Sequence, residues 1–104
     1  MTDLVIRKLS ETFSDADREV AAAELDATGI NEERVHLAII KLSERKLGEL
    51  RKFIEVAKVD QRDVLAWAEY PEEFAAATWN MKEEEVAEIR VKDREQYLSW
   101  LRGK

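Results

Sequence analysis

Residues 31–42 read NEERVHLAIIKL and hold the densest run of apolar side chains in the chain. Four of these side chains recur at the i, i+3, i+4 and i+7 spacing of one helix face: Val35, Ala38, Ile39 and Leu42. Leu37 and Ile40 widen that face over most of the helix circumference. A helix that is apolar nearly all round has to be enclosed by other elements. The sequence therefore predicts a bundle built around a central buried helix at residues 31–43.

The segments on either side of this helix carry signals for further helices. Ser14 is a good N-cap for a helix that we expect to end at Gly29, in the left-handed conformation. Asn31 is predicted to cap the central helix, so that the two helices form a tight hairpin. Further along, Asp60 is predicted to cap a helix, and Pro71 either ends that helix or begins the next.

Two segments leave their structure open. Residues 2–13 suit a short helix, although residues 4–6 alone could form an edge strand, and we favour the helix. Residues 82–102 are acidic at the start and basic at the end, as the helix dipole favours. This segment forms either one helix or two with a break near Lys92, because residues 93–96 have the pattern of a capping box.

Composition supports an all-α fold. The chain of 104 residues contains 3 glycines and 1 proline, too few for an architecture with many turns. We predict a compact irregular bundle of about five or six helices that forms a single domain over residues 1–104. The N-terminus does not resemble a secretory signal, and no apolar run is long enough to cross a membrane. With no cysteine in the chain, a cytoplasmic location is the expectation.

No motif for catalysis or metal binding is complete in this sequence. Glu33 and His36 have the Glu-x-x-His spacing of di-iron helical bundles, but a full site needs a second such pair and the chain has 1 histidine. Ser43 and Lys46 match the Ser-x-x-Lys pattern without the two companion motifs of the enzymes that use it. We therefore expect no catalytic residue, no metal site and no cofactor, and predict that the protein is not an enzyme.

Charge is unevenly distributed along a chain with a net charge of −6. Residues 1–40 carry −5 and residues 63–104 carry −4, whereas residues 41–62 carry +3. The only basic cluster lies in that middle segment: Lys41, Arg45, Lys46, Arg51 and Lys52. It is a candidate polyanion patch, but acidic residues are interleaved with it, which favours an ordinary solvated helix face. Nucleic-acid binding is therefore the alternative hypothesis, not the leading one.

Aromatic residues near chain joints and ends suggest a partner surface. The candidates are Trp79, Tyr97 and Trp100. Tyr97 and Trp100 either dock on their own bundle, which we favour, or contact another subunit, because aromatic anchors are enriched at interfaces. The leading hypothesis is thus a small soluble protein that acts through protein–protein interaction, with an unknown protein partner or a second copy of itself.

Three pieces of the chain support a resemblance at the family level: RVHLAIIKLS, DVLAWAEYP and DREQYLSWL. Together they resemble a group of small, uncharacterised, all-helical bacterial proteins. The resemblance covers most of the chain from about Arg34 onward and carries no motif of known chemistry. It implies a compact bacterial helical protein and adds no activity.

Overall fold

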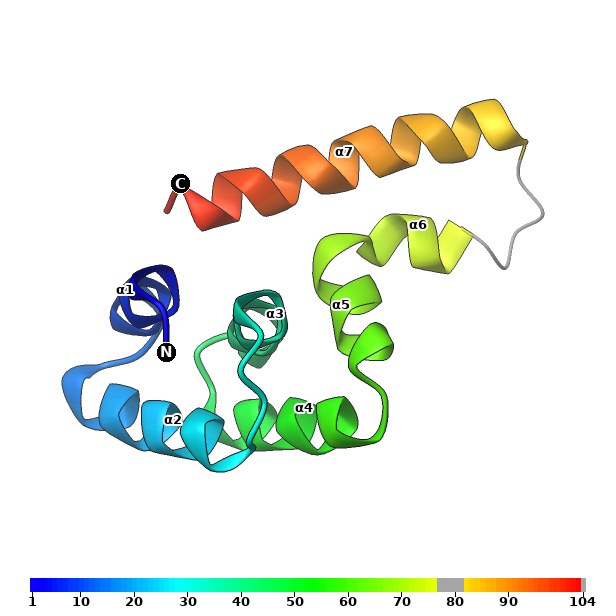
Figure 1. Cartoon of the computed structure of the whole chain (residues 1–104). Helices are drawn as coiled ribbons and strands as arrows, with labels where there is room; N and C mark the ends of the chain where they lie inside the picture. The colour runs from blue at the N-terminus through cyan, green and yellow to red at the C-terminus, as the bar shows by residue number, and fades with distance from the viewer. Residues whose placement is uncertain (77–81, 104) are drawn as a thin grey trace.

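The computed structural model describes residues 1–76 and 82–103, and those two ranges contain seven helices and no strand (Figure 1). The helices are α1 (Asp3–Thr12), α2 (Asp15–Ala27), α3 (Glu33–Ser43), α4 (Leu47–Val59), α5 (Gln61–Glu69), α6 (Pro71–Ala76) and α7 (Glu83–Leu101). The all-α prediction is confirmed, although we expected five or six helices. None of these helices is sufficiently long and apolar to cross a membrane.

Helix α3 lies at the centre of the bundle, as its sequence predicts. It packs against α1, α4 and α5, and in Figure 1 it sits between α1 and α5 with α2 and α4 beneath. Ile39 and Ile40 are both fully inaccessible to solvent. Burial of neighbouring residues on several sides of one short helix is what makes it the core element.

The start of α3 differs from the prediction. The helix begins at Glu33, with Glu32 in the N-cap position, so the expectation that Asn31 caps it is wrong. The hydroxyl of Thr28 accepts a hydrogen bond from the Ile30 backbone N–H at 3.0 Å. Because of this local turn after α2, α3 begins two residues later than the predicted range 31–43, and Asn31 lies in the exposed link between the two helices.

The open question at the N-terminus is resolved in favour of a helix. Residues 3–12 form α1, and the Thr2 hydroxyl accepts a capping hydrogen bond from the Val5 backbone N–H at 3.3 Å. Val5 and Leu9 from this helix are buried in the core. The apolar spacing that suited a helix therefore marks the buried face of α1.

The C-terminal segment is one helix, with no break near Lys92. Asp93, which looked like the start of a capping box, is 2% exposed and caps a different helix. Its carboxylate accepts hydrogen bonds from the backbone N–H groups of Glu72 at 3.3 Å and Glu73 at 2.8 Å, in the first turn of α6. Asp93 thus satisfies donors that α6 cannot satisfy itself and ties α6 to α7.

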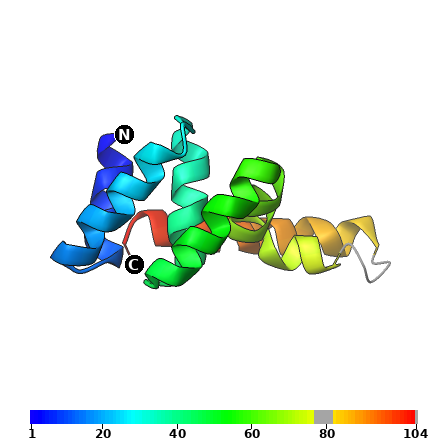
Figure 2. The same ribbon diagram turned by 90° about the horizontal axis from the view of Figure 1, so that it is seen from below.

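Helix α7 spans the molecule. Its N-terminal half runs beside α6 and projects from the bundle, and its C-terminal end reaches α1 (Figures 1 and 2). At that end, Arg7 donates to the carbonyl oxygen of Leu101 at 2.7 Å, and the Lys8 ammonium donates to that of Trp100. Cations from α1 therefore bind carbonyl oxygens of the last turn of α7, where the helix dipole favours positive charge.

A pair of glycine substitutions tests the link between α2 and α3. Gly29 has a φ of +74°, as predicted for the residue that follows α2, and a Cβ there would meet no atom within 4 Å. Gly29→Ala is expected to lower the free energy of unfolding by about 1 kcal/mol, because L-residues are strained in the left-handed region. Gly48, inside α4, also has open space around it, and Gly48→Ala should instead stabilise by about 0.5 kcal/mol. Urea melts of both variants measure these shifts, and two shifts of the same sign would contradict the assigned backbone conformation.

Candidate functional site

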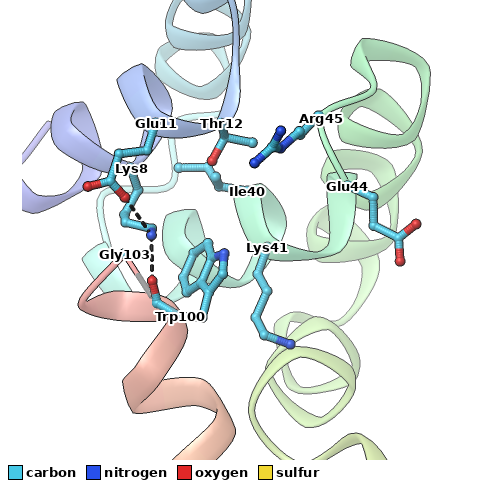
Figure 3. Close-up of a pocket in the computed structure, with 9 residues that line it drawn as sticks. All are labelled: Lys8, Glu11, Thr12, Ile40, Lys41, Glu44, Arg45, Trp100 and Gly103. Carbon is cyan, nitrogen blue, oxygen red and sulfur yellow. Dashed lines mark hydrogen bonds and ion pairs between the residues drawn. The ribbon is translucent and has the colours of Figure 1, made fainter.

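A cleft of about 330 Å³ lies where α1, the C-terminal end of α3 and the C-terminal end of α7 meet (Figure 3). Nine residues line it: Lys8, Glu11, Thr12, Ile40, Lys41, Glu44, Arg45, Trp100 and Gly103. The cleft combines the predicted partner residue Trp100 with two members of the predicted polyanion patch, Lys41 and Arg45. Its volume falls at the lower end of the range of roughly 300–1,000 Å³ that is common for ligand sites.

One wall of the cleft is built around Lys8, which is only 3% exposed. Its ammonium donates to a carboxylate oxygen of Glu11 at 2.7 Å and to the carbonyl oxygen of Trp100. The same ammonium lies 4.3 Å from the centre of the Trp100 ring, within cation–π distance. The charge of Lys8 is thus balanced within the protein, and its role is to hold Trp100 against α1.

Trp100 and Tyr97 pack on their own bundle and remain partly exposed. Their ring centroids are 5.6 Å apart, and both side chains contact the hydrophobic core. Burial raises the pKa of the Tyr97 hydroxyl above its ordinary value, and within the described ranges that hydroxyl has no hydrogen-bond partner. The third predicted partner residue, Trp79, lies outside the described residues.

Lys41 and Arg45 bring positive charge to the opposite wall. Lys41 is half-buried in the last turn of α3, and burial lowers its pKa, although the nearby carboxylates of Asp93 and Glu44 oppose that effect. Arg45 is exposed, and Figure 3 shows its guanidinium turned toward Thr12 and Ile40 at the cleft. In the part of the chain that the structure describes, neither cation forms an ion pair.

The turn after α3 has an unusual backbone conformation. Glu44 and Arg45 are consecutive non-glycine residues with φ angles of 48° and 68°. The left-handed region costs an L-residue roughly 1–2 kcal/mol, and such strain is found more often at functional sites than elsewhere. The turn directs Arg45 to the cleft, whereas Figure 3 shows the Glu44 carboxylate pointing away from Trp100.

The other residues of the predicted polyanion patch lie elsewhere. Arg51 forms an ion pair with Glu24 of α2 at 2.7 Å, and Lys52 lies 3.8 Å from Glu49 on its own helix. Lys46 is exposed in the N-cap position of α4 and does not line the cleft. The five basic residues are close in sequence but do not form one patch, because the turn between α3 and α4 separates them.

A second feature, a row of aromatic side chains, was not predicted as a site. Phe53 of α4, Trp67 of α5 and Phe74 of α6 are in edge-to-face contact, with centroid distances of 6.1 and 6.4 Å. Trp67 is half-buried, and Phe74 is 50% exposed. Trp67 and Phe74 belong to different helices, so no helical spacing in the sequence indicated their contact, which depends on how α5 and α6 pack.

The cleft is lined by cations and an aromatic ring and does not hold a set of metal ligands among the described residues. In residues 1–76 and 82–103 no three histidine, cysteine or acidic side chains converge so as to hold a metal ion. His36 is buried in α3 and is not among the cleft residues. Comparison of the chain with protein-family models, curated proteins and solved structures finds no match.

Proposed function

We propose that this protein is not an enzyme and acts by binding another protein, with Trp100 at the centre of the contact. One observation carries the proposal. Trp100 is partly exposed, and the Lys8 ammonium packs against its ring. Trp100 shares a cleft with Lys41 and Arg45, which have no ion-pair partner among the described residues. Tryptophan and arginine are among the residues most enriched at the energetic centres of protein interfaces.

The side chains of the cleft favour binding over catalysis. General acid–base catalysis needs a carboxylate or similar group that is free to exchange a proton with a substrate. Glu11 is held by Lys8 at 2.7 Å and also lies 3.6 Å from Arg7. Glu44 also lines the cleft, but its carboxylate points away from Trp100, so the groups beside the aromatic ring are mainly the donors of Lys41 and Arg45, which suit recognition. We place this interaction in the cytoplasm, because the chain has no cysteine.

The experiment is a comparison of Trp100→Ala with the matched variant Phe74→Ala. The wild-type chain, purified from its native host, is expected to retain a protein partner or to self-associate in light scattering, and Trp100→Ala should abolish this. Because Trp100 is only partly buried, we expect its loss to cost about 1–3 kcal/mol of stability, below the 3–5 kcal/mol of a fully buried tryptophan. Phe74→Ala removes an exposed aromatic side chain on α6 and should leave the association unchanged.

Two results would count against the proposal. The first is a strictly monomeric wild-type chain with no retained partner. The second is an equal effect of Trp100→Ala and Phe74→Ala on association. Since Trp100→Ala also removes packing, Arg45→Glu serves as a second variant: its side chain is exposed, so it should weaken association with a change in stability within about 0.5 kcal/mol.

A further inference from the structure

We propose that the cleft recognises an acidic peptide segment of the partner, with carboxylates bound by Lys41 and Arg45 beside the Trp100 ring. This inference rests on the proposed function, because it assigns a chemical class to the partner that the same cleft would bind. It identifies the ligand as a carboxylate-rich stretch of polypeptide.

The first step of the argument is the hydrogen-bonding character of the free groups. The lysine ammonium, the arginine guanidinium and the indole N–H are donors and do not accept. In Figure 3 the indole nitrogen of Trp100 faces the space next to Ile40 and Lys41. Within the described chain, Trp100 forms hydrogen bonds only through its backbone, and its carbonyl oxygen accepts from Lys8 and from the Gly103 N–H. Its indole N–H has no partner among the described residues. These three donors come from two helices and a turn and all border the cleft, with the Lys41 ammonium and the Arg45 guanidinium on opposite sides of it in Figure 3.

The second step is the charge balance of the cleft. Lys8 and Glu11 compensate one another at 2.7 Å, and the Glu44 carboxylate points away. Asp93 and Glu44 both attract Lys41 electrostatically, but neither carboxylate forms an ion pair with it within the described residues. Lys41 and Arg45 therefore bring two positive charges to the cleft against one lining carboxylate, that of Glu44, without an ion-pair partner among the described residues, in a chain whose net charge is −6. Charged and donor groups of this kind select a ligand of opposite charge.

The third step distinguishes a peptide from a nucleic acid. Nucleic-acid affinity grows with the number of phosphates that cations neutralise, so it needs a row of free cations. Arg51 and Lys52 are paired with Glu24 and Glu49, and the segments before and after the basic cluster carry −5 and −4. Those segments would repel a long polyanion. A concave site of about 330 Å³ suits a few side chains of a peptide, and Ile40 and the Trp100 ring offer apolar contact between the carboxylates.

Fluorescence anisotropy with a labelled hexaglutamate peptide tests the inference, using the full chain at low salt. We expect saturable binding, weakened about tenfold by Lys41→Gln combined with Arg45→Gln. The matched control combines Lys52→Gln with Lys58→Gln, which removes the same charge from exposed positions on α4 and should change affinity less than about twofold. In NMR spectra, the indole N–H signal of Trp100 should shift on addition of hexaglutamate and that of Trp67 should not.

The outcomes separate this inference from the proposed function. Absence of hexaglutamate binding, equal weakening by both double variants, or an unshifted Trp100 signal would overturn the acidic-peptide assignment. Tighter binding of a single-stranded oligonucleotide of equal charge would overturn it in favour of a nucleic acid. If any of these occurs while the native partner is still lost in Trp100→Ala, only the assigned chemistry is wrong. If no partner is retained at all, the proposed function is wrong as well.

Discussion

Replacing Ile39 with aspartate is expected to unfold the protein. Ile39 is fully buried in α3, the helix that packs against α1, α4 and α5. An unpaired carboxylate in such an environment costs several kcal/mol at least, and the isoleucine packing is lost as well. Small domains are stable by only about 5–15 kcal/mol, so one such change is sufficient to remove the folded state. Loss of helical circular dichroism and of a cooperative urea transition would be the expected result.

The matched control places the same charge on the surface. Val59, the last residue of α4, is 90% exposed, so Val59→Asp should alter the free energy of unfolding by no more than about 0.5 kcal/mol. If Ile39→Asp melted with a cooperative transition like that of Val59→Asp, α3 would not be the enclosed core element and the described packing would be incorrect.

Replacing Asp93 with alanine is expected to destabilise the protein by about 2–3 kcal/mol, since a hydrogen bond to a charged group makes a net contribution of about 1.5–3 kcal/mol. The substitution leaves the N–H groups of Glu72 and Glu73 without their acceptor. Because α6 has six residues, it depends on this external cap more than a long helix would. Hydrogen exchange should show lost protection in α6 and in the facing part of α7, with α1 to α4 unaffected.

Two further variants test whether the effect comes from the charge and the position of the Asp93 carboxylate. Asp93→Asn keeps an acceptor oxygen and removes the charge, so we expect less than half of the alanine effect. Glu95→Ala removes an exposed carboxylate from the same helix and should be nearly neutral. Equal urea melts for Asp93→Ala and Glu95→Ala would show that the carboxylate of Asp93 does not hold α6 in place.

Local signals in the sequence predicted most of the helices. Thr2 and Asp60 cap α1 and α5 with their side chains, and Gly29 adopts the left-handed conformation after α2, as short-range rules predict. The wrong N-cap assignment at Asn31 and the question left open near Lys92 have a shared cause. The residue type shows that a side chain can cap a helix. The sequence pattern does not reveal which backbone N–H groups it will cap, and these can belong to a helix distant in the sequence.

The cleft was predicted only in parts. Trp100 was selected as an aromatic residue near a chain end, and Lys41 and Arg45 as members of a basic run, with nothing to connect the two sets. Lys8 was not selected, because its sequence environment does not distinguish it from Arg7 beside it. Its burial depends on the arrival of α7 at α1, which joins residues more than 90 positions apart.

The sequence by itself determined that this chain folds as helices around a central helix predicted at residues 31–43, since apolar periodicity and backbone hydrogen bonding act over a few residues. Only the tertiary structure decided that Asp93 caps α6 and that Lys41, Arg45 and Trp100 share a cleft. Those arrangements depend on how whole helices pack, and the direction of a link or the site where a helix end docks is set by contacts summed over the entire bundle.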